Sequence, residues 1–97
     1  MKFGAMVATK IDDWQLLPYA ESIGYDSGWV PDSQMIWSDC YAVLALAAYH
    51  TERIEIGTGV SISGTRIAPV TAHSIASINA LAQARRSDLA SLESGAP

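Results

Sequence analysis

Short apolar runs alternate along the chain with longer segments in which apolar residues recur at helical spacing. Three runs are too short for buried helices and predict buried strands: residues 2–7, 26–30 and 53–59. The remaining apolar segments predict helices at about residues 12–23, 39–50 and 70–82. Pro18 falls about one turn inside the first helix and removes an amide donor there, so we expect a late helix start or a kink.

The strand–helix alternation also predicts how these elements are arranged. Short strands separated by helices of this length form parallel sheets with right-handed crossovers, which makes the fold class α/β. Parallel strands end at a shared edge, so the loops after Val7, Val30 and Gly59 converge. Ligands bind at that edge in such folds. The sequence therefore places its candidate site in these three loops.

The composition of the chain argues against several classes of protein. The 97 residues suffice for one small domain, and the net charge of −4 argues against a nucleic-acid surface. One cysteine, Cys40, allows no internal disulfide, and we expect it to pack in a helix and the protein to be cytoplasmic. No signal core and no long uncharged apolar span is visible, so we expect neither secretion nor a membrane partner.

The end of the chain differs from the rest. "QARRSDLASLESGAP", residues 83–97, holds no aromatic or β-branched residue, and its large apolar residues are Leu89 and Leu92. Helix propensity allows the third helix to continue to about Ser94, where Gly95 and Pro97 would stop it. We therefore predict a helical tail rather than a fourth strand.

Two long stretches carry a family resemblance. "KFGAMVATKIDDWQLLPYAESIGYDSGWVPDSQMIWSDCYAVLALAA" and "RIEIGTGVSISGTRIAPVTAHSIASINALA" resemble the start of luciferase-like flavin- or deazaflavin-dependent oxidoreductases. The similarity to the methylene-tetrahydromethanopterin reductase branch is strongest in "IGTGV", "TR" and "P". The resemblance implies three βα units of a TIM (β/α)8 barrel with a coenzyme at the strand ends. It also implies hydride transfer to or from a small-molecule substrate, or monooxygenation of it, in the full-length family.

The resemblance also divides the chain. Residues 1–82 correspond to the N-terminal part of the luciferase-like barrel, and residues 83–97 form a divergent tail. The family continues with a fourth strand and a glycine-rich phosphate region where this tail stands. We therefore expect a fragment of an oxidoreductase that is inactive alone. Three strands cut from a barrel leave open edges, so we also expect a homo-oligomer.

The resemblance assigns a coenzyme-binding role to the loop after the third strand: Thr58, Gly59, Val60 and Ser61. Small residues let a flat ring approach the backbone, whereas the alternative is a flexible strand end. In deazaflavin members the bond matching Gly59–Val60 is a non-proline cis peptide. Because many of its surroundings lie in parts absent here, we expect a trans bond in this chain. "GTGV" with "TR..P" favours a deazaflavin (coenzyme F-420) over flavin mononucleotide (FMN).

Three further residues are candidates. Asp32 in "VPDS" matches an aspartate near the coenzyme ring in the family, and its catalytic role competes with that of a turn aspartate. Some members have a histidine where Ser33 stands, which leaves no histidine acid–base there. Arg66 could bind an anionic substrate or coenzyme tail through its planar donors, the alternative being a solvated surface arginine. Trp37 could line the substrate pocket, the alternative being a place in the core.

No metal site is expected, because His50, His73 and Cys40 are too widely spaced to form a ligand set. The sequence does not identify the substrate. A non-catalytic, self-associating α/β domain is the alternative to an oxidoreductase.

Overall fold

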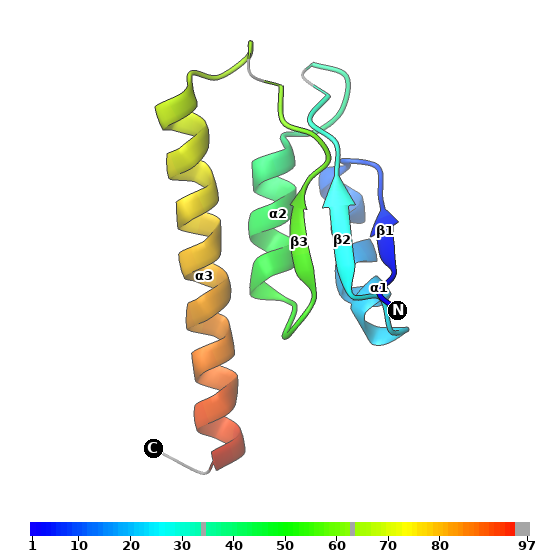
Figure 1. Ribbon diagram of the computed structural model, residues 1–97, viewed down its shortest axis with the longest axis vertical. Coiled ribbons are helices and arrows are strands. Elements are labelled where there is room, and N and C mark those ends of the chain that lie inside the picture. Colours follow the sequence, from blue (N-terminus) through cyan, green and yellow to red (C-terminus); the bar gives the residue numbers. More distant parts are fainter. Residues whose placement is uncertain (34, 63, 95–97) are drawn as a thin grey trace.

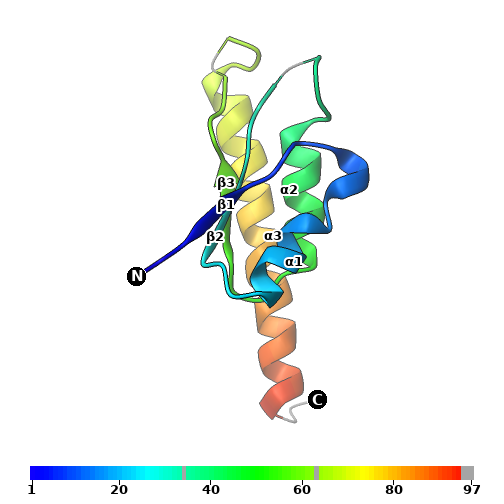
Figure 2. The ribbon, with the colours of Figure 1, turned by 90° about the vertical axis from the view of Figure 1, so that its right-hand side faces the viewer.

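The computed structural model describes residues 1–33, 35–62 and 64–94, with side chains up to residue 87. Three parallel strands pair in the order β1 (Gly4–Met6), β2 (Ser27–Val30) and β3 (Glu55–Thr58). The helices α1 (Leu16–Ser22), α2 (Cys40–Tyr49) and α3 (Ala68–Ser94) follow the strands in turn. All three cover the same face of the sheet (Figures 1 and 2). The α/β class and the parallel βα order predicted from the sequence are confirmed.

Pro18 explains where the first helix begins. A 3-10 turn at Ile11–Asp13 precedes α1, which starts only at Leu16, so Pro18 lies in its first turn. Backbone amides have no helical acceptor there, and the missing proline donor costs nothing. Gly24 follows the helix with a φ of 103°, a left-handed conformation that ends helices readily. The late start was predicted, whereas a helix beginning at residue 12 was wrong.

The core lies between the sheet and its helices. The largest buried side chains come from all layers: Leu17, Val30, Val43, Leu44 and Ile54. The apolar surface of α2 is wrapped on several sides, because this helix packs between the sheet and α3. Gly28 lets α1 approach β2, since a Cβ at this position would overlap Cδ2 of Leu17. Burial of apolar surface thus holds α1 against β2, α2 against β2 and β3, and α3 against α2.

The opposite face of the sheet is uncovered. Met6 is 65% exposed and Trp29 40% exposed on that face. The indole of Trp29 lies across Gly57, where an added Cβ would be 2.9 Å from the ring. In Figure 2, where the sheet is seen nearly from its edge, the helices lie on one side of it and no helix lies on the other. An apolar face is therefore open to solvent.

α3 is much longer than the other helices. It begins at Ala68, two residues before the predicted start, and continues to Ser94, so the tail is helical as far as the structure describes it. Residues 95–97 lie outside the described part. The division of the chain at residue 82 remains a prediction. No described helix combines the length and apolar character needed to cross a membrane.

Candidate functional site

The loops that follow β2 and β3 lie together at the carboxyl end of the sheet (Figure 1). The Gly59 amide donates to the Val30 carbonyl at 2.9 Å, which extends the parallel pairing past β3. The Asp32 amide then donates to the Val60 carbonyl at 3.3 Å. The structure therefore brings the predicted catalytic residue next to the predicted coenzyme loop.

The loop after β1 joins them through Thr9, which sequence reasoning missed. Thr9 is fully buried. Its hydroxyl donates to the Pro31 carbonyl, and its carbonyl accepts from the Ser38 amide at 2.9 Å. Its place just after a predicted strand could have marked Thr9 as a site residue. Its hydrogen-bond partners could not be predicted, because they lie more than twenty residues away in the sequence. The loop after β2 is thus hydrogen-bonded both to the loop after β1 and to the loop after β3.

Asp32 holds the loop after β3 as well as its own. Its side chain is buried, with 7% of the residue exposed, and Oδ2 accepts from the Ile62 amide at 3.0 Å. Together with the Asp32 amide, the carboxylate thus contacts the backbone on both sides of Ser61. This arrangement positions the coenzyme loop. The catalytic role assigned from the sequence remains a prediction.

Cys40 is buried beside Asp32 at the start of α2. Burial, together with the nearby carboxylates of Asp32 and Asp39, which disfavour a further negative charge, raises the pKa of the Cys40 thiol to about 12. The thiol therefore stays protonated at neutral pH and is no nucleophile. The expectation that Cys40 packs in a helix is confirmed.

A hollow of about 250 Å³ opens between the second and third loops. Asp32, Trp37 and Arg66 line it together with Met35, Ser38 and Asp39. Asp32 and Trp37 lie in one loop, and the fold brings the distant Arg66 from the next loop beside them. The proposed substrate contacts of Trp37 and Arg66 remain untested by this arrangement.

The guanidinium of Arg66 already has partners. Nη2 lies 2.8 Å from Oδ1 of Asp39, and the guanidinium stacks 4.4 Å from the ring centre of Tyr41. Asp39 also caps α2, because its Oδ2 accepts from the Ala42 amide at 3.2 Å. The ion pair was not predicted from the sequence. Arg66 thus has fewer donors to offer an anion than its sequence position suggested.

The predicted coenzyme loop has a defined shape. The hydroxyls of Thr58 and Ser61 lie 3.0 Å apart and hydrogen-bond, while Val60 is 75% exposed. A Cβ on Gly59 would lie 3.4 Å from the Met6 methyl group, so this glycine faces the open side of the sheet. The Gly59–Val60 peptide bond is cis, and our expectation of a trans bond was wrong.

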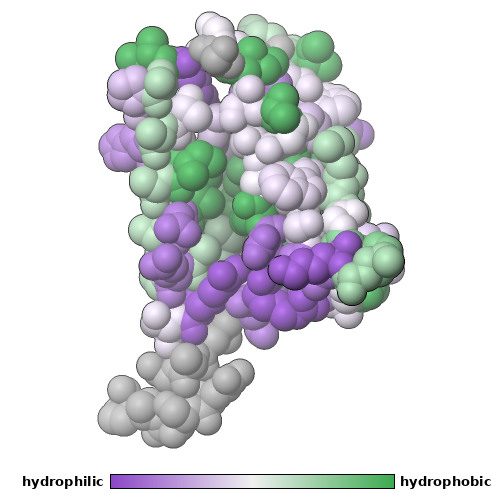
Figure 3. All heavy atoms as spheres, in the orientation of Figure 1, coloured by the Kyte–Doolittle hydropathy of each residue, from purple (hydrophilic) through white to green (hydrophobic). Residues whose placement is uncertain are grey.

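Exposed apolar side chains surround the hollow. The loops contribute Met35, Ile36, Trp37, Val60, Ile62 and Ile67. Figure 3 shows apolar groups gathered at this end of the molecule and polar groups at the opposite end. Exposed clusters of this kind mark binding surfaces. Among the described side chains, no group of three or more His, Cys, Asp or Glu is placed to hold a metal ion.

Comparison with known proteins accounts for this arrangement. The model of the luciferase-like monooxygenase family matches residues 12–87, which is most of the chain. This chain belongs to the luciferase-like monooxygenase family. The family resemblance stated from the sequence is confirmed, and the match includes both loops of the hollow.

One curated relative shows how much of a luciferase-like protein is present. A 5,10-methylenetetrahydromethanopterin reductase from Methanolobus tindarius is 39% identical over 66 residues. That match covers 68% of this chain but only 20% of the relative. Whether this luciferase-like chain could hold a coenzyme therefore depends on the residues that the chain itself contains.

Those residues fit a flat coenzyme ring better than its charged tail. The exposed Val60 and Trp37 offer apolar surface, and the hydroxyls of Thr58 and Ser61 offer hydrogen bonds at its rim. A phosphate tail needs cationic donors, but Arg66 at this edge is paired with Asp39. The described loops of this luciferase-like chain would thus suit a ring better than a phosphate tail.

Proposed function

We propose that this chain forms one wall of the coenzyme site of a luciferase-like oxidoreductase. The coenzyme is a deazaflavin (coenzyme F-420), with FMN as the alternative, and the reaction is hydride transfer to or from a small molecule. The observation that carries the proposal is the hollow in which Asp32, Trp37 and Arg66 meet beside the Thr58–Ser61 loop. The resemblance to the methylene-tetrahydromethanopterin reductase branch favours the deazaflavin.

When bound, the ring would supply the hydride chemistry, and this chain would supply its position. Val60 would contact the ring from one side, while the Thr58 and Ser61 hydroxyls would orient its polar rim. Asp32 would hold that loop in position by accepting a hydrogen bond from the Ile62 amide. Trp37 would shield one side of the hollow from water. The isolated chain would bind without turnover, because Arg66, the cation at this edge among the described residues, is paired with Asp39 rather than open to the phosphates.

A titration tests this proposal. The purified chain is mixed with coenzyme F-420 and, separately, with FMN, and coenzyme absorbance and fluorescence are followed. We expect submillimolar binding of coenzyme F-420, weaker binding of FMN and no hydride transfer. Trp37→Ala should weaken binding several-fold, whereas Tyr19→Ala, an exposed aromatic residue on α1, should leave it unchanged.

The alternative function is a non-catalytic domain that associates with itself. The uncovered sheet face with Met6 and Trp29 favours it, because such a face gains from being buried. Binding of both coenzymes weaker than millimolar, with the folded state verified by circular dichroism, would select this alternative.

A further inference from the structure

Three residues set the charge of the hollow at the strand ends. The loops after β2 and β3, residues 31–39 and 59–67, hold two carboxylates, Asp32 and Asp39, and one cation, Arg66. All three side chains line the hollow of about 250 Å³, and the other residues that line it are uncharged. Two carboxylates against one guanidinium leave these loops with one net negative charge at neutral pH.

The guanidinium of Arg66 is held from three directions. Nη2 pairs with Oδ1 of Asp39 at 2.8 Å, and Nη1 lies 3.5 Å from Oγ of Ser74. The ring of Tyr41, which is 5% exposed, has its centre 4.4 Å from the guanidinium carbon. A planar guanidinium can satisfy an ion pair and a stacked ring together, so this arrangement holds it firmly. An anion in the hollow would have to displace Asp39 before it could pair with Arg66.

Asp39 is itself fixed by the helix that it caps. Its Oδ2 accepts from the Ala42 amide at 3.2 Å, while its Oδ1 faces Arg66. The positive end of the α2 dipole favours a carboxylate at this position, and Asp39 already occupies it. Displacing Asp39 would cost the ion pair and the cap, and the buried Asp32 would still repel the incoming anion.

We propose that Asp39 makes the hollow select an uncharged or cationic group of the substrate and exclude an anionic one. This selectivity rests on the proposed function, in which the substrate enters the hollow. Arg66, neutralised by Asp39, is then a positioning residue that links the loop after β3 to the start of α2. Trp37 and Met35 supply apolar surface for a flat, uncharged group. Direct binding of an anion by Arg66, as expected from the sequence, is the competing outcome.

Three probes of one shape and different charge test this selectivity. Benzamide is uncharged, benzoate is an anion and benzamidinium is a cation, and all three carry the same flat ring. Each is titrated into the 97-residue chain, and binding is followed through the NMR signal of the Trp37 indole N–H. We expect benzamide and benzamidinium to bind at low millimolar concentration and benzoate at least fivefold more weakly.

Protein variants assign the selectivity to Asp39. Asp39→Asn keeps an oxygen for the cap of α2 but no longer neutralises Arg66. Benzoate should bind this variant at least fivefold more tightly than the unaltered chain, and benzamide should bind both alike. Adding Arg66→Gln should remove the gain, because the freed guanidinium is its source. Asp12→Asn, the same change at an exposed position outside the hollow, should leave the order of the probes unchanged. Thermal unfolding verifies that the variants fold.

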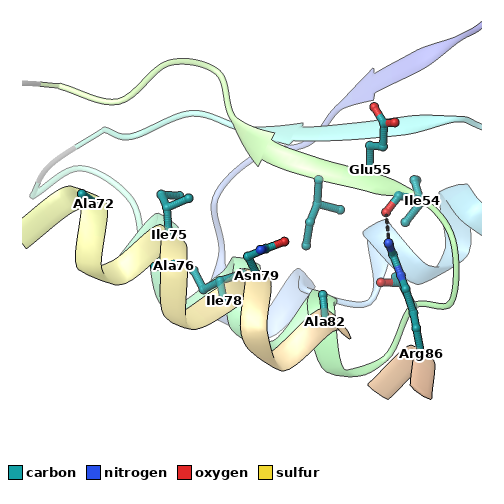
Figure 4. A pocket seen from close by; sticks show the side chains of 11 residues that line it. Ile54, Glu55, Ala72, Ile75, Ala76, Ile78, Asn79, Ala82 and Arg86 are labelled. Atoms are coloured by element: carbon teal, nitrogen blue, oxygen red, sulfur yellow. Dashed lines mark hydrogen bonds between the residues drawn. The ribbon is translucent and has the colours of Figure 1, made fainter. Parts of the chain in front are cut away.

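A second cavity in the molecule needs a control of its own. A groove of about 530 Å³ lies between β3 and α3, and Arg86 reaches across its end to donate to the Ile54 carbonyl at 3.0 Å (Figure 4). A probe bound in this groove would shift the side-chain amide signal of Asn79, which lines it, rather than the indole signal of Trp37. Arg86→Gln should therefore leave the titrations followed at Trp37 unchanged.

Three results would overturn the inference: equal binding of benzoate and benzamide, no gain for benzoate in Asp39→Asn, or no probe binding at Trp37. Tighter binding of benzoate to the unaltered chain, abolished by Arg66→Gln, would overturn it in favour of an anion site at Arg66.

The coenzyme titration separates this selectivity from the proposed function. A chain that distinguishes the three probes but binds neither coenzyme would contradict the proposed function alone. A chain that binds coenzyme F-420 but takes benzoate as well as benzamide would contradict the selectivity alone.

Discussion

Glu21 joins three backbone amides through one carboxylate. Its side chain accepts from the amides of Glu52, Arg53 and Ile54 at 2.7–3.1 Å, which fixes the end of α1 to the start of β3. Burial alone would raise the pKa of Glu21, but these hydrogen bonds and the Arg53 charge outweigh it and leave the pKa below its ordinary value of 4.5. The folded state therefore prefers the ionised group.

A stability–pH profile follows from this preference. Because the pKa of Glu21 is lower in the folded state, its contribution is complete above pH 4.5 and is lost as the pH falls through the lower folded value. Glu21→Gln should cost about 1 kcal/mol at pH 7, after allowing for solvent screening, and flatten the acid limb. Urea unfolding at several pH values measures this. Glu52→Gln is the control, and an equal effect of both variants would contradict the role of Glu21.

Asp32 gives a second test at the level of one residue. Asp32→Ala removes the acceptor of the Ile62 amide, so that amide should exchange with solvent about tenfold faster, which corresponds to about one hydrogen bond. Asp32→Asn keeps an acceptor oxygen and should restore most of the protection. Ser33→Ala is the matched control. Amide exchange measured by NMR tests this prediction. Unchanged protection of the Ile62 amide in Asp32→Ala would contradict the role of Asp32 in holding the loop after β3.

Among the elements, the contact of α1 with β2 depends on one missing side chain. An alanine at Gly28 would push its Cβ into Leu17, which is fully buried and cannot move into solvent. Gly28→Ala should destabilise the fold by about 1–3 kcal/mol, the usual cost of overpacking. Gly64→Ala adds the same methyl group where no atom lies within 4 Å and should be nearly neutral. Chemical unfolding of the two variants gives the comparison.

The elements themselves were largely predictable, whereas the contacts between loops were not. Short apolar runs located the strands, and Pro18 indicated the late start of α1. The buried Thr9 and the Arg66–Asp39 pair depend on residues more than twenty positions apart. Such contacts depend on tertiary packing and leave no local pattern. Asp32 was placed correctly near the coenzyme loop because strand ends converge, but its hydrogen bond to Ile62 could not be foreseen.

For the whole molecule, the uncovered sheet face remains the basis for predicting self-association. Burying a few hundred Å² of apolar surface is worth several kcal/mol at about 25 cal/mol per Å². We expect a dimer through this face, with Met6 and Trp29 at its centre. Met6→Lys should shift light scattering at micromolar concentration toward the monomer, whereas Tyr19→Lys on the helical side should not. A monomer with a sharp, cooperative melt would contradict this expectation.

Chemical labelling of the buried Cys40 thiol can measure how often the candidate site opens. At pH 8 a pKa of about 12 leaves roughly one thiol in ten thousand as the reactive thiolate, and the closed fold shields even that fraction. Disulfide reagents should therefore label the chain only when the start of α2 separates from the loop of Asp32. The labelling rate, compared with that of the urea-unfolded chain, then gives the equilibrium for opening the candidate site. Because the sequence holds one cysteine, every labelled molecule reports that single event.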